Sequence, residues 1–383
     1  MIIMQGKYNT ATVFVDSFDE ATAAQIQLML NHPAMADSQI RIMSDCHAGT
    51  GSVIGFTMTR NKTVIPNLIG VDIGCRVFAI NLGKDRQIDL ERFDDFVVDT
   101  VPAGPVGHNG NDHLAFMTNA EKNNLKAAEA CLFAEIPMGD YWSKLGTMGS
   151  GNHFIELDKA PDDNIWLVIH SGSRHFGNLV AKWHQEQAKR IAPGYPDMEF
   201  LAEDAAEMYI SDMKHAQLYA QVNVRTMARI ILCGYFGMPM HAIEHLDIIE
   251  SVHNYIDFDD NIIRKGAIRS HRDERVIIPM NRAFGCVIGT GKSAINYNLS
   301  APHGAGRILS RSQAKKRLSI EKLKADMAGI YTSTADKSTL DEAPDAYKNP
   351  ASILKYIHET VNVDYIMKPI YSFKDSKRDS MGD

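Results

Sequence analysis

The chain has 383 residues, of which 45% are hydrophobic and 23% are charged, a balance typical of a globular protein with a large buried core. The formal net charge of −7 excludes nucleic-acid binding through bulk charge, so such binding needs a local basic patch. Five scattered cysteines without a close pair exclude a disulfide framework and predict a reducing, cytoplasmic location.

The first half of the chain predicts one helix and two strands that end in polar residues. Apolar residues recur after Asp19 until a proline stops the pattern, which predicts a helix that begins just after Asp19. The apolar runs at residues 40–43 and 166–169 predict strands. These strands lead directly to Asp45 and His170, so we expect them to place functional side chains at their ends.

The second half of the chain predicts a long helical region and then strands. Residues 202–233 carry methionine and aliphatic side chains at helical spacing, which predicts one helix or two with a core-facing stripe. Residues 276–309 are typical of strand and loop, and the segments near 311–328 and 351–360 are typical of helix. Residues 365–374 predict a short strand.

The chain shows no sign of internal division. No repeat, low-complexity tract or Pro/Ser-rich linker marks a boundary, so we expect one catalytic domain over residues 1–374 and a flexible tail at 375–383. No charged leader precedes a long apolar core, and no stretch is apolar enough to span a bilayer. We therefore expect no membrane partner.

Short segments rich in glycine, serine or asparagine surround one cysteine and four histidines: Cys75, His153, His170, His253 and His303. Cysteine, histidine and aspartate bind divalent metals of borderline softness, and glycine lets such side chains approach from distant segments. Together with Asp72, the first four of these residues supply one thiolate, three imidazoles and one carboxylate. A thiolate is negatively charged and can bridge two cations, so the pattern favours a binuclear centre, with His303 left for another role.

Phosphate-binding features accompany these candidate ligands. Asn152 stands in a glycine-rich segment, and Arg174 ends a Ser-Gly-Ser-Arg run whose hydroxyls, amides and guanidinium suit phosphate oxygens. Arg307 follows His303 by four residues, as suits a nucleophile that faces a polyphosphate. The basic residues at 307–317 are either a local nucleic-acid patch or a solvated helix face.

Seven sequence blocks resemble those of the RtcB RNA ligase family, in the same order and over nearly the whole chain. They are Asp45-Cys-His-Ala-Gly, Val71-Asp-Ile-Gly-Cys75, Gly149-Ser-Gly-Asn-His-Phe-Ile-Glu156, His170-Ser-Gly-Ser-Arg174, His253-Asn, Arg264-Lys-Gly-Ala267 and His303-Gly-Ala-Gly-Arg-Ile-Leu-Ser-Arg311. The resemblance implies an α+β fold, a single compact domain of packed β-sheets flanked by helices with a central metal and nucleotide cleft. Among RtcB proteins the chain looks like a divergent, shorter bacterial-type paralogue.

The resemblance also implies an activity. It is that of a GTP- and manganese-dependent RNA ligase, which joins RNA 3′-phosphate or 2′,3′-cyclic phosphate ends to 5′-hydroxyl ends in RNA repair or tRNA splicing. The implied route passes through a guanylylated histidine and an RNA-3′-pp-5′-G intermediate. The implied partners are such RNA ends and GTP, and the sequence defines no helper protein.

Carried over to the matching positions, the resemblance implies two Mn²⁺ ions that share one ligand. One ion is implied to bind Asp72, Cys75 and His153, and the other Cys75, His170 and His253. Manganese rests on the resemblance alone, because ligand softness by itself favours zinc, cobalt or iron.

The resemblance implies that His303 is the nucleophile and that Asp45 assists it. The implied nucleotide contacts are Asn152, Glu156, Asn281, Cys286, His303, Tyr347 and Lys374. The implied phosphate or RNA contacts are Arg174 and Arg307.

The sequence departs from the family pattern at several positions. Arg76 follows the metal cysteine where glycine is usual, and His175 and Phe176 replace small or aliphatic residues. The usual Pro-Gly-Ser-Met-Gly loop is Pro-Met-Asn-Arg-Ala at residues 279–283, and Cys286 stands where a serine is usual. Two alternatives therefore stay open: a metal-dependent RNA 2′,3′-cyclic phosphate hydrolase with weak or lost ligation, and a non-catalytic RNA-end binding protein.

Overall fold

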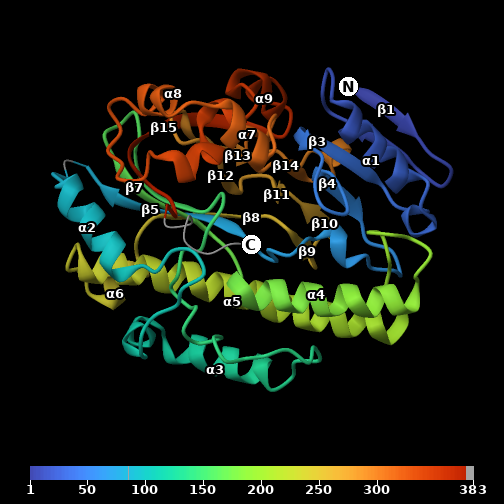
Figure 1. The fold of residues 1–383 in the computed structure, drawn as a ribbon, viewed down its shortest axis with the longest axis horizontal. Coiled ribbons are helices and arrows are strands. Elements are labelled where there is room, and N and C mark those ends of the chain that lie inside the picture. Colours follow the sequence, from blue (N-terminus) through green and yellow to red (C-terminus); the bar gives the residue numbers. More distant parts are fainter. Residues whose placement is uncertain (85, 377–383) are drawn as a thin grey trace.

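The computed structural model describes residues 1–84 and 86–376, and its strands form three sheets (Figure 1). The largest sheet has the strand order β12-β13-β15-β6-β7-β5-β8, the second has the order β1-β2-β3-β4-β10-β9, and β11 pairs with β14. The strands are β1 (Ile2–Gln5), β2 (Thr10–Val13), β3 (Ile40–His47), β4 (Ile54–Thr59), β5 (Arg76–Gly83), β6 (Phe154–Lys159), β7 (Ile165–Ser171), β8 (Ile248–Val252), β9 (Tyr255–Asp257), β10 (Ile262–Lys265), β11 (Ala267–Arg269), β12 (Arg275–Asn281), β13 (Gly285–Gly291), β14 (Ser300–Pro302) and β15 (Val361–Phe373).

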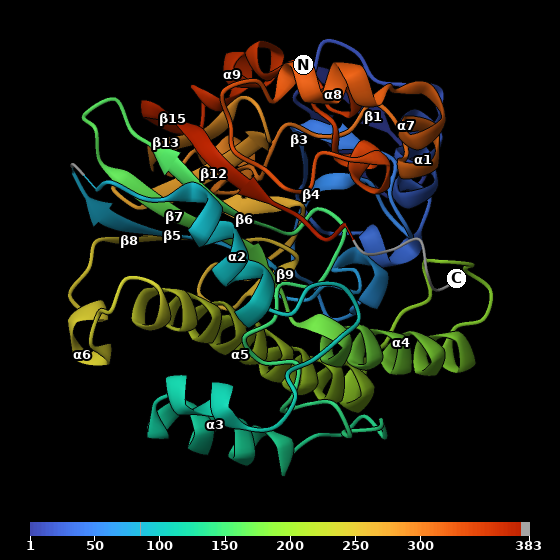
Figure 2. The same ribbon diagram turned by 60° about the vertical axis from the view of Figure 1, so that its left-hand side comes forward.

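Helices cover the sheets from two sides (Figures 1 and 2). They are α1 (Glu20–Leu30), α2 (Leu90–Thr100), α3 (Asn119–Glu129), α4 (Arg174–Ile191), α5 (Glu203–Gly234), α6 (Met240–Ile243), α7 (Arg311–Arg317), α8 (Ile320–Asp326) and α9 (Pro350–Ile357). Among the short 3₁₀ helices, η5 (Lys337–Glu342) bears on the site. The long helices α4 and α5 lie side by side beneath the sheets, with α3 on the outer side of α5, and α7 to α9 lie on the opposite side of the molecule.

The largest sheet packs its apolar face on α5. Alternate residues of β5 and β7, such as Ile80 and Leu167, are fully buried against Val224, Met227 and Ile231 of the helix. Burial of aliphatic side chains is the main favourable term in folding, and the stripe of α5 contributes to it under β5 and β7. The predicted role of the methionine and aliphatic stripe as core is therefore confirmed.

Most predicted elements are present, with different limits. The helix after Asp19 is α1, whose first turn is capped by the Asp19 carboxylate accepting from the amide of Thr22 at 2.8 Å. Residues 202–233 form one helix rather than two, and the predicted strand at 40–43 continues through His47. The predicted strand at 365–374 begins earlier and forms the thirteen residues of β15.

The structure also bears on helices that the sequence analysis missed, on the predicted tail and on membrane-spanning segments. The sequence did not predict α2, α3 or α4. Most of the predicted tail at 375–383 lies outside the described residues, which end at 376. No helix of residues 1–84 and 86–376 is long and apolar enough to cross a membrane.

The side chain of Arg264 on β10 lies in a buried ionic cluster. It is fully buried and pairs with Asp257 at 2.8 Å and with Asp260 at 2.7 Å, and it donates to Ser300 Oγ at 2.8 Å. Removing one partner of such a cluster leaves uncompensated buried charge, so Arg264→Met is expected to lower the free energy of unfolding by about 3–5 kcal/mol.

Urea denaturation measures this loss, and Arg275→Met is the matched control. The Arg275 side chain is 41% exposed and pairs with Asp247, which is 46% exposed, so its loss is expected to cost only about 0–1 kcal/mol. Equal losses in the two variants would contradict a stabilising role specific to the buried cluster.

Candidate active site

The candidate metal ligands meet at one edge of the largest sheet because of strand direction. Neighbouring strands in the order β6-β7-β5-β8 are antiparallel, so the start of one strand lies beside the end of the next. His153 and Cys75 immediately precede β6 and β5, while His170 is near the end of β7 and His253 follows β8. Four side chains that are far apart in sequence are therefore brought together.

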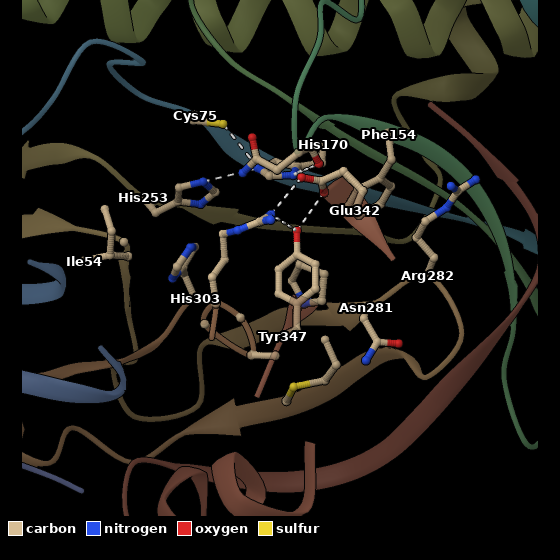
Figure 3. Close-up of a pocket in the computed structure, with 18 of the residues that line it drawn as sticks. Ile54, Cys75, Phe154, His170, His253, Asn281, Arg282, His303, Glu342 and Tyr347 are labelled. Atoms are coloured by element: carbon tan, nitrogen blue, oxygen red, sulfur yellow. Dashed lines mark hydrogen bonds and ion pairs between the residues drawn. The ribbon is translucent and has the colours of Figure 1, made fainter. Parts of the chain in front are cut away.

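Cys75 lies between His153 and His170, and Figure 3 shows it beside His170. Its Sγ is 3.4 Å from Nε2 of His153 and 3.2 Å from Nε2 of His170. His153 Nε2 is 2.9 Å from Oδ2 of Asp72, and His170 Nε2 is 3.3 Å from Nε2 of His253. The contacts run from Asp72 through His153, Cys75 and His170 to His253, so they include the first set that the resemblance implies, Asp72, Cys75 and His153, and the second set, Cys75, His170 and His253. The ligand atoms of Cys75, His153 and His170 all lie within 4.8 Å of one another, and the division of the ligands between two ions stays a prediction.

These separations suit atoms that bind a common ion. Ligands about 2.0–2.3 Å from one metal lie roughly 3–3.8 Å from each other, which matches the distances around Cys75. Nδ1 of His170 is 3.1 Å from the carbonyl oxygen of Asn152, an arrangement in which Nδ1 donates and Nε2 keeps its lone pair. Burial first, and then neighbouring basic groups, lower the pKa values of His170 and His253, so both imidazoles are neutral and able to bind metal.

Asp72 is the anionic member of the first set. Burial opposes its ionisation, but His153 and Arg174 outweigh burial and lower the pKa of this carboxyl. Arg174 Nη1 lies 2.9 Å from Nδ1 of His153, so the guanidinium is beside the first set of ligands. The residues present therefore fit a site for divalent metal.

Metal binding is expected to strengthen as pH rises. Burial and the charge of Asp72 raise the pKa of the Cys75 thiol well above its usual range, so the metal-free protein keeps this proton at neutral pH. A bound metal displaces the proton, and the apparent affinity for Mn²⁺ should rise about tenfold per pH unit while pH stays below that pKa. Calorimetry in two buffers with different ionisation heats counts the protons released, and zero release between about pH 6 and pH 8 would contradict a thiolate ligand.

His303 lies beside the metal ligands and is held by Asp45. It follows β14, and its Nδ1 is 2.6 Å from Oδ2 of Asp45 on β3, which also accepts from the His303 backbone amide at 3.2 Å. The Asp45 side chain is fully buried and that of His303 is 18% exposed. The carboxylate fixes the proton on Nδ1, which leaves a lone pair on Nε2.

His303 and the loop that follows it lie close to the candidate metal ligands and to β3. The ring centroids of His303 and His253 are 4.9 Å apart, so the imidazole stands directly next to the second set of metal ligands. Gly306 has φ +74°, and a Cβ there would lie 2.1 Å from the carbonyl oxygen of Asp45, so only glycine brings this loop so close to β3.

A cavity opens between His303 and the C-terminal elements (Figure 3). The predicted site residues that line it are Asp72, Cys75, Asn152, Glu156, His170, His253, Asn281, His303, Arg307, Tyr347 and Lys374. Asp45 supports His303 from behind, whereas His153 and Arg174 line a neighbouring groove. Cys286 is fully buried and lies within 4.8 Å of the buried Glu156 and Asp158, so it is placed behind the wall of the cavity.

Glu342 at the end of η5 is a site residue that the sequence did not reveal. Its carboxylate is 3.0 Å from Arg307 Nη1 and 2.9 Å from Arg311 Nη1 on one oxygen. The other oxygen is 3.1 Å from Lys374 Nζ and accepts from the Tyr347 hydroxyl at 2.7 Å. No spacing rule marks a single glutamate of this kind; the only signal is its position just before the Pro-Asp-Ala-Tyr segment at 344–347.

The charged form of Glu342 is stabilised more than the charged form of Lys374. Burial opposes ionisation of Glu342, but Lys374 and the two arginines outweigh it and lower its pKa to about 2. Burial lowers the pKa of Lys374, which shares its carboxylate with two guanidinium groups and so gains less from the pairing. Arginines and a lysine gathered in one cavity are suited to bind phosphate oxygens.

The side of the cavity formed by β6 and β12 is suited to a polar ring. Burial raises the pKa of Glu156, and burial together with the nearby charge of Glu156 raises the pKa of Asp158. Asn281 Oδ1 accepts from the amides of Ala283 and Phe284 at 3.1 and 2.9 Å, so this oxygen stabilises the turn after β12. Only its amide nitrogen is left to contact a ligand.

Comparison with known proteins gives a consistent result. A family model described as "tRNA-splicing ligase RtcB" matches residues 25–375. The RNA-splicing ligase RtcB of Escherichia coli (strain K12) is 27% identical over 366 residues, which cover 88% of this chain and 90% of that protein. The tRNA-splicing ligase RtcB of Nanoarchaeum equitans is 28% identical over 403 residues, covering 83% of this chain and 84% of that protein. The RNA-splicing ligase RtcB of Mycobacterium bovis is 24% identical over 335 residues, covering 74% and 70%.

Proposed function

Because the chain belongs to the RtcB family, we propose that it is an RNA ligase that uses GTP and two Mn²⁺ ions. It joins an RNA 3′-phosphate or 2′,3′-cyclic phosphate end to a 5′-hydroxyl end, in RNA repair or tRNA splicing. The single observation that carries the proposal is the position of His303 next to two donor sets that share Cys75.

His303 is the proposed nucleophile. Its Nε2 attacks the α-phosphorus of GTP, the bond to the β-phosphate oxygen breaks, and pyrophosphate leaves. Asp45 holds the Nδ1 proton and stabilises the positive charge that develops on the ring. The nucleotide then passes to the RNA 3′-phosphate, which gains GMP as a leaving group, and the 5′-hydroxyl displaces the GMP.

The metal centre is proposed to neutralise phosphate charge. Asp72, Cys75 and His153 would hold one Mn²⁺, and Cys75, His170 and His253 the other. When bound, the two ions supply Lewis acidity to phosphate oxygens in both transfer steps. Asn152 positions His170 through its carbonyl oxygen, and that oxygen also accepts from Lys374 at 3.1 Å.

Nucleotide binding is proposed for the cavity itself. Among the arginines that line the cavity, Arg307 lies nearest to His303 in sequence and is placed to hold phosphates. Tyr347 offers an aromatic face for the base. Glu156 and Lys374 present a carboxyl and an ammonium group to the polar edge of guanine. Since Arg307 and Lys374 already pair with Glu342, a triphosphate competes with this carboxylate for them.

A ligation assay tests the proposal. The protein is incubated with an RNA that ends in a 3′-phosphate and an RNA that begins with a 5′-hydroxyl, with each of four nucleoside triphosphates and with Mn²⁺, Zn²⁺, Co²⁺ or Mg²⁺. Joined product only with GTP and Mn²⁺ is the expected result. In a parallel reaction the first RNA ends in a 2′,3′-cyclic phosphate, and its conversion to a 3′-phosphate without joining, under every condition, would instead support a phosphohydrolase.

A further inference from the structure

A second groove reaches the metal ligands by a different route from the cavity with His303. It has a volume of about 520 Å³ and is lined by Asp72 and His153, two of the proposed metal ligands. Asp72 lines both spaces, whereas His303 lines only the cavity. A molecule in this groove therefore meets the metal centre without passing the proposed nucleotide site.

The charges of the groove suit a nucleic-acid strand. Lys144, Arg174 and Lys182 bring three cations to its walls, and the acidic residues there are Asp72 and Asp140. Contacts from lysine and arginine to phosphate oxygens position a nucleic-acid backbone without regard to sequence. Because Asp72 belongs to the metal centre, Asp140 is the acid that requires another explanation.

Asp140 is paired with a histidine that the sequence already marked as unusual. His175, in the first turn of α4, stands where a small or aliphatic residue is usual in the family pattern, and its Nδ1 is 3.0 Å from Oδ2 of Asp140. The two side chains are 51% and 38% exposed, so neither is part of the core. Lys144 Nζ lies 3.9 Å from the same carboxylate oxygen.

His175 and Asp140 have the geometry of a general base and the carboxylate that orients it. A carboxylate that accepts from Nδ1 fixes the tautomer and leaves the Nε2 lone pair for a substrate. His175 is the imidazole in this groove that is not among the proposed metal ligands, since the other, His153, belongs to the first set. It thus stands in a solvent-accessible groove together with cations for a phosphate backbone and with the edge of the metal centre.

We infer that His175, positioned by Asp140, is the general base for the RNA joining step. The 5′-hydroxyl oxygen bonds to the phosphorus of the activated 3′-phosphate, the bond to the GMP oxygen breaks, and GMP leaves with the electron pair. The hydroxyl proton passes to Nε2 of His175. This inference rests on the proposed function, and it assigns His175 to the second half of the reaction because the groove does not include His303.

The test separates the two halves of the reaction. His175→Gln removes the base, and His245→Gln, at an exposed position on neither the cavity nor the groove, is the matched control. The first measurement is covalent labelling by GTP labelled at the α-phosphate. The second is single-turnover joining of an RNA whose 3′-phosphate already carries GMP.

His175→Gln is expected to slow joining about 100-fold, the low end of the range for general-base catalysis, with the KM for RNA changed less than about threefold. Labelling should stay at the wild-type level, which shows that the variant is folded. In His175→Ala, added imidazole should restore part of the joining rate, because it supplies the missing base. Unchanged joining, or a loss confined to KM, overturns the inference, while failure of wild-type protein to label or join overturns the proposed function instead.

Discussion

Replacement of His303 by alanine is expected to abolish covalent transfer of the nucleotide to the protein and to reduce RNA joining by roughly four orders of magnitude or more, as for loss of a covalent nucleophile. The reason is geometric. His303 is the histidine that Asp45 orients through a 2.6 Å contact and that still has an exposed edge in the cavity. The proposed metal ligands next to it would have their Nε2 atoms occupied, so they cannot replace it.

Labelling with GTP that carries a radioactive α-phosphate measures this prediction directly, followed by denaturing electrophoresis. His358→Ala is a matched control, since this histidine is exposed and does not line the cavity. The variant at His303 should still join an RNA whose 3′-phosphate already carries GMP, because that substrate no longer needs the nucleophile. Persistent labelling of His303→Ala would assign the nucleophile elsewhere.

Replacement of Cys75 by alanine is expected to remove both metals and nearly all ligation. The Cys75 sulfur is the one atom shared by the two donor sets, at 3.4 Å from His153 Nε2 and 3.2 Å from His170 Nε2. Loss of a group that only supports a ligand typically costs about 10–100-fold in metal affinity, so loss of this bridging ligand should cost more than that for each ion. The fold should survive, with a change in the free energy of unfolding of about 1 kcal/mol, typical of a single substitution.

Inductively coupled plasma mass spectrometry of protein dialysed against Mn²⁺ gives the number of ions per chain. Cys233→Ala is the control, because this half-buried cysteine lies on α5 and contributes to neither donor set. Two ions in the wild type and in Cys233→Ala, with none in Cys75→Ala, is the expected pattern. Undiminished metal in Cys75→Ala would exclude the bridging role.

The sequence was sufficient to select candidate metal ligands that lie together in the fold, but not to explain how they meet. Their residue types and glycine-rich surroundings indicated Cys75 and the histidines, since chemistry of this kind depends on local composition. Their convergence depends on the strand order β6-β7-β5-β8, which is set by long-range pairing. No local pattern predicts that β8, from far along the chain, lies at the edge next to β5.

Elements and site residues that the sequence missed have different causes. The capping box of α3, in which Thr118 and Glu121 bond reciprocally, was a usable signal that the prediction overlooked. The start of α4 was hidden, because Ser173 makes no capping bond with its side chain and Arg174 has φ +55°. Glu342 could not be found from sequence because its importance comes from four partners on separate segments.

Crystals grown with Mn²⁺ and measured at the manganese absorption edge test most directly the claim that two cations share the sulfur of Cys75. Two anomalous peaks are predicted, one touching Asp72, Cys75 and His153 and the other touching Cys75, His170 and His253. A single peak, or peaks that do not touch Cys75 Sγ, would contradict the account.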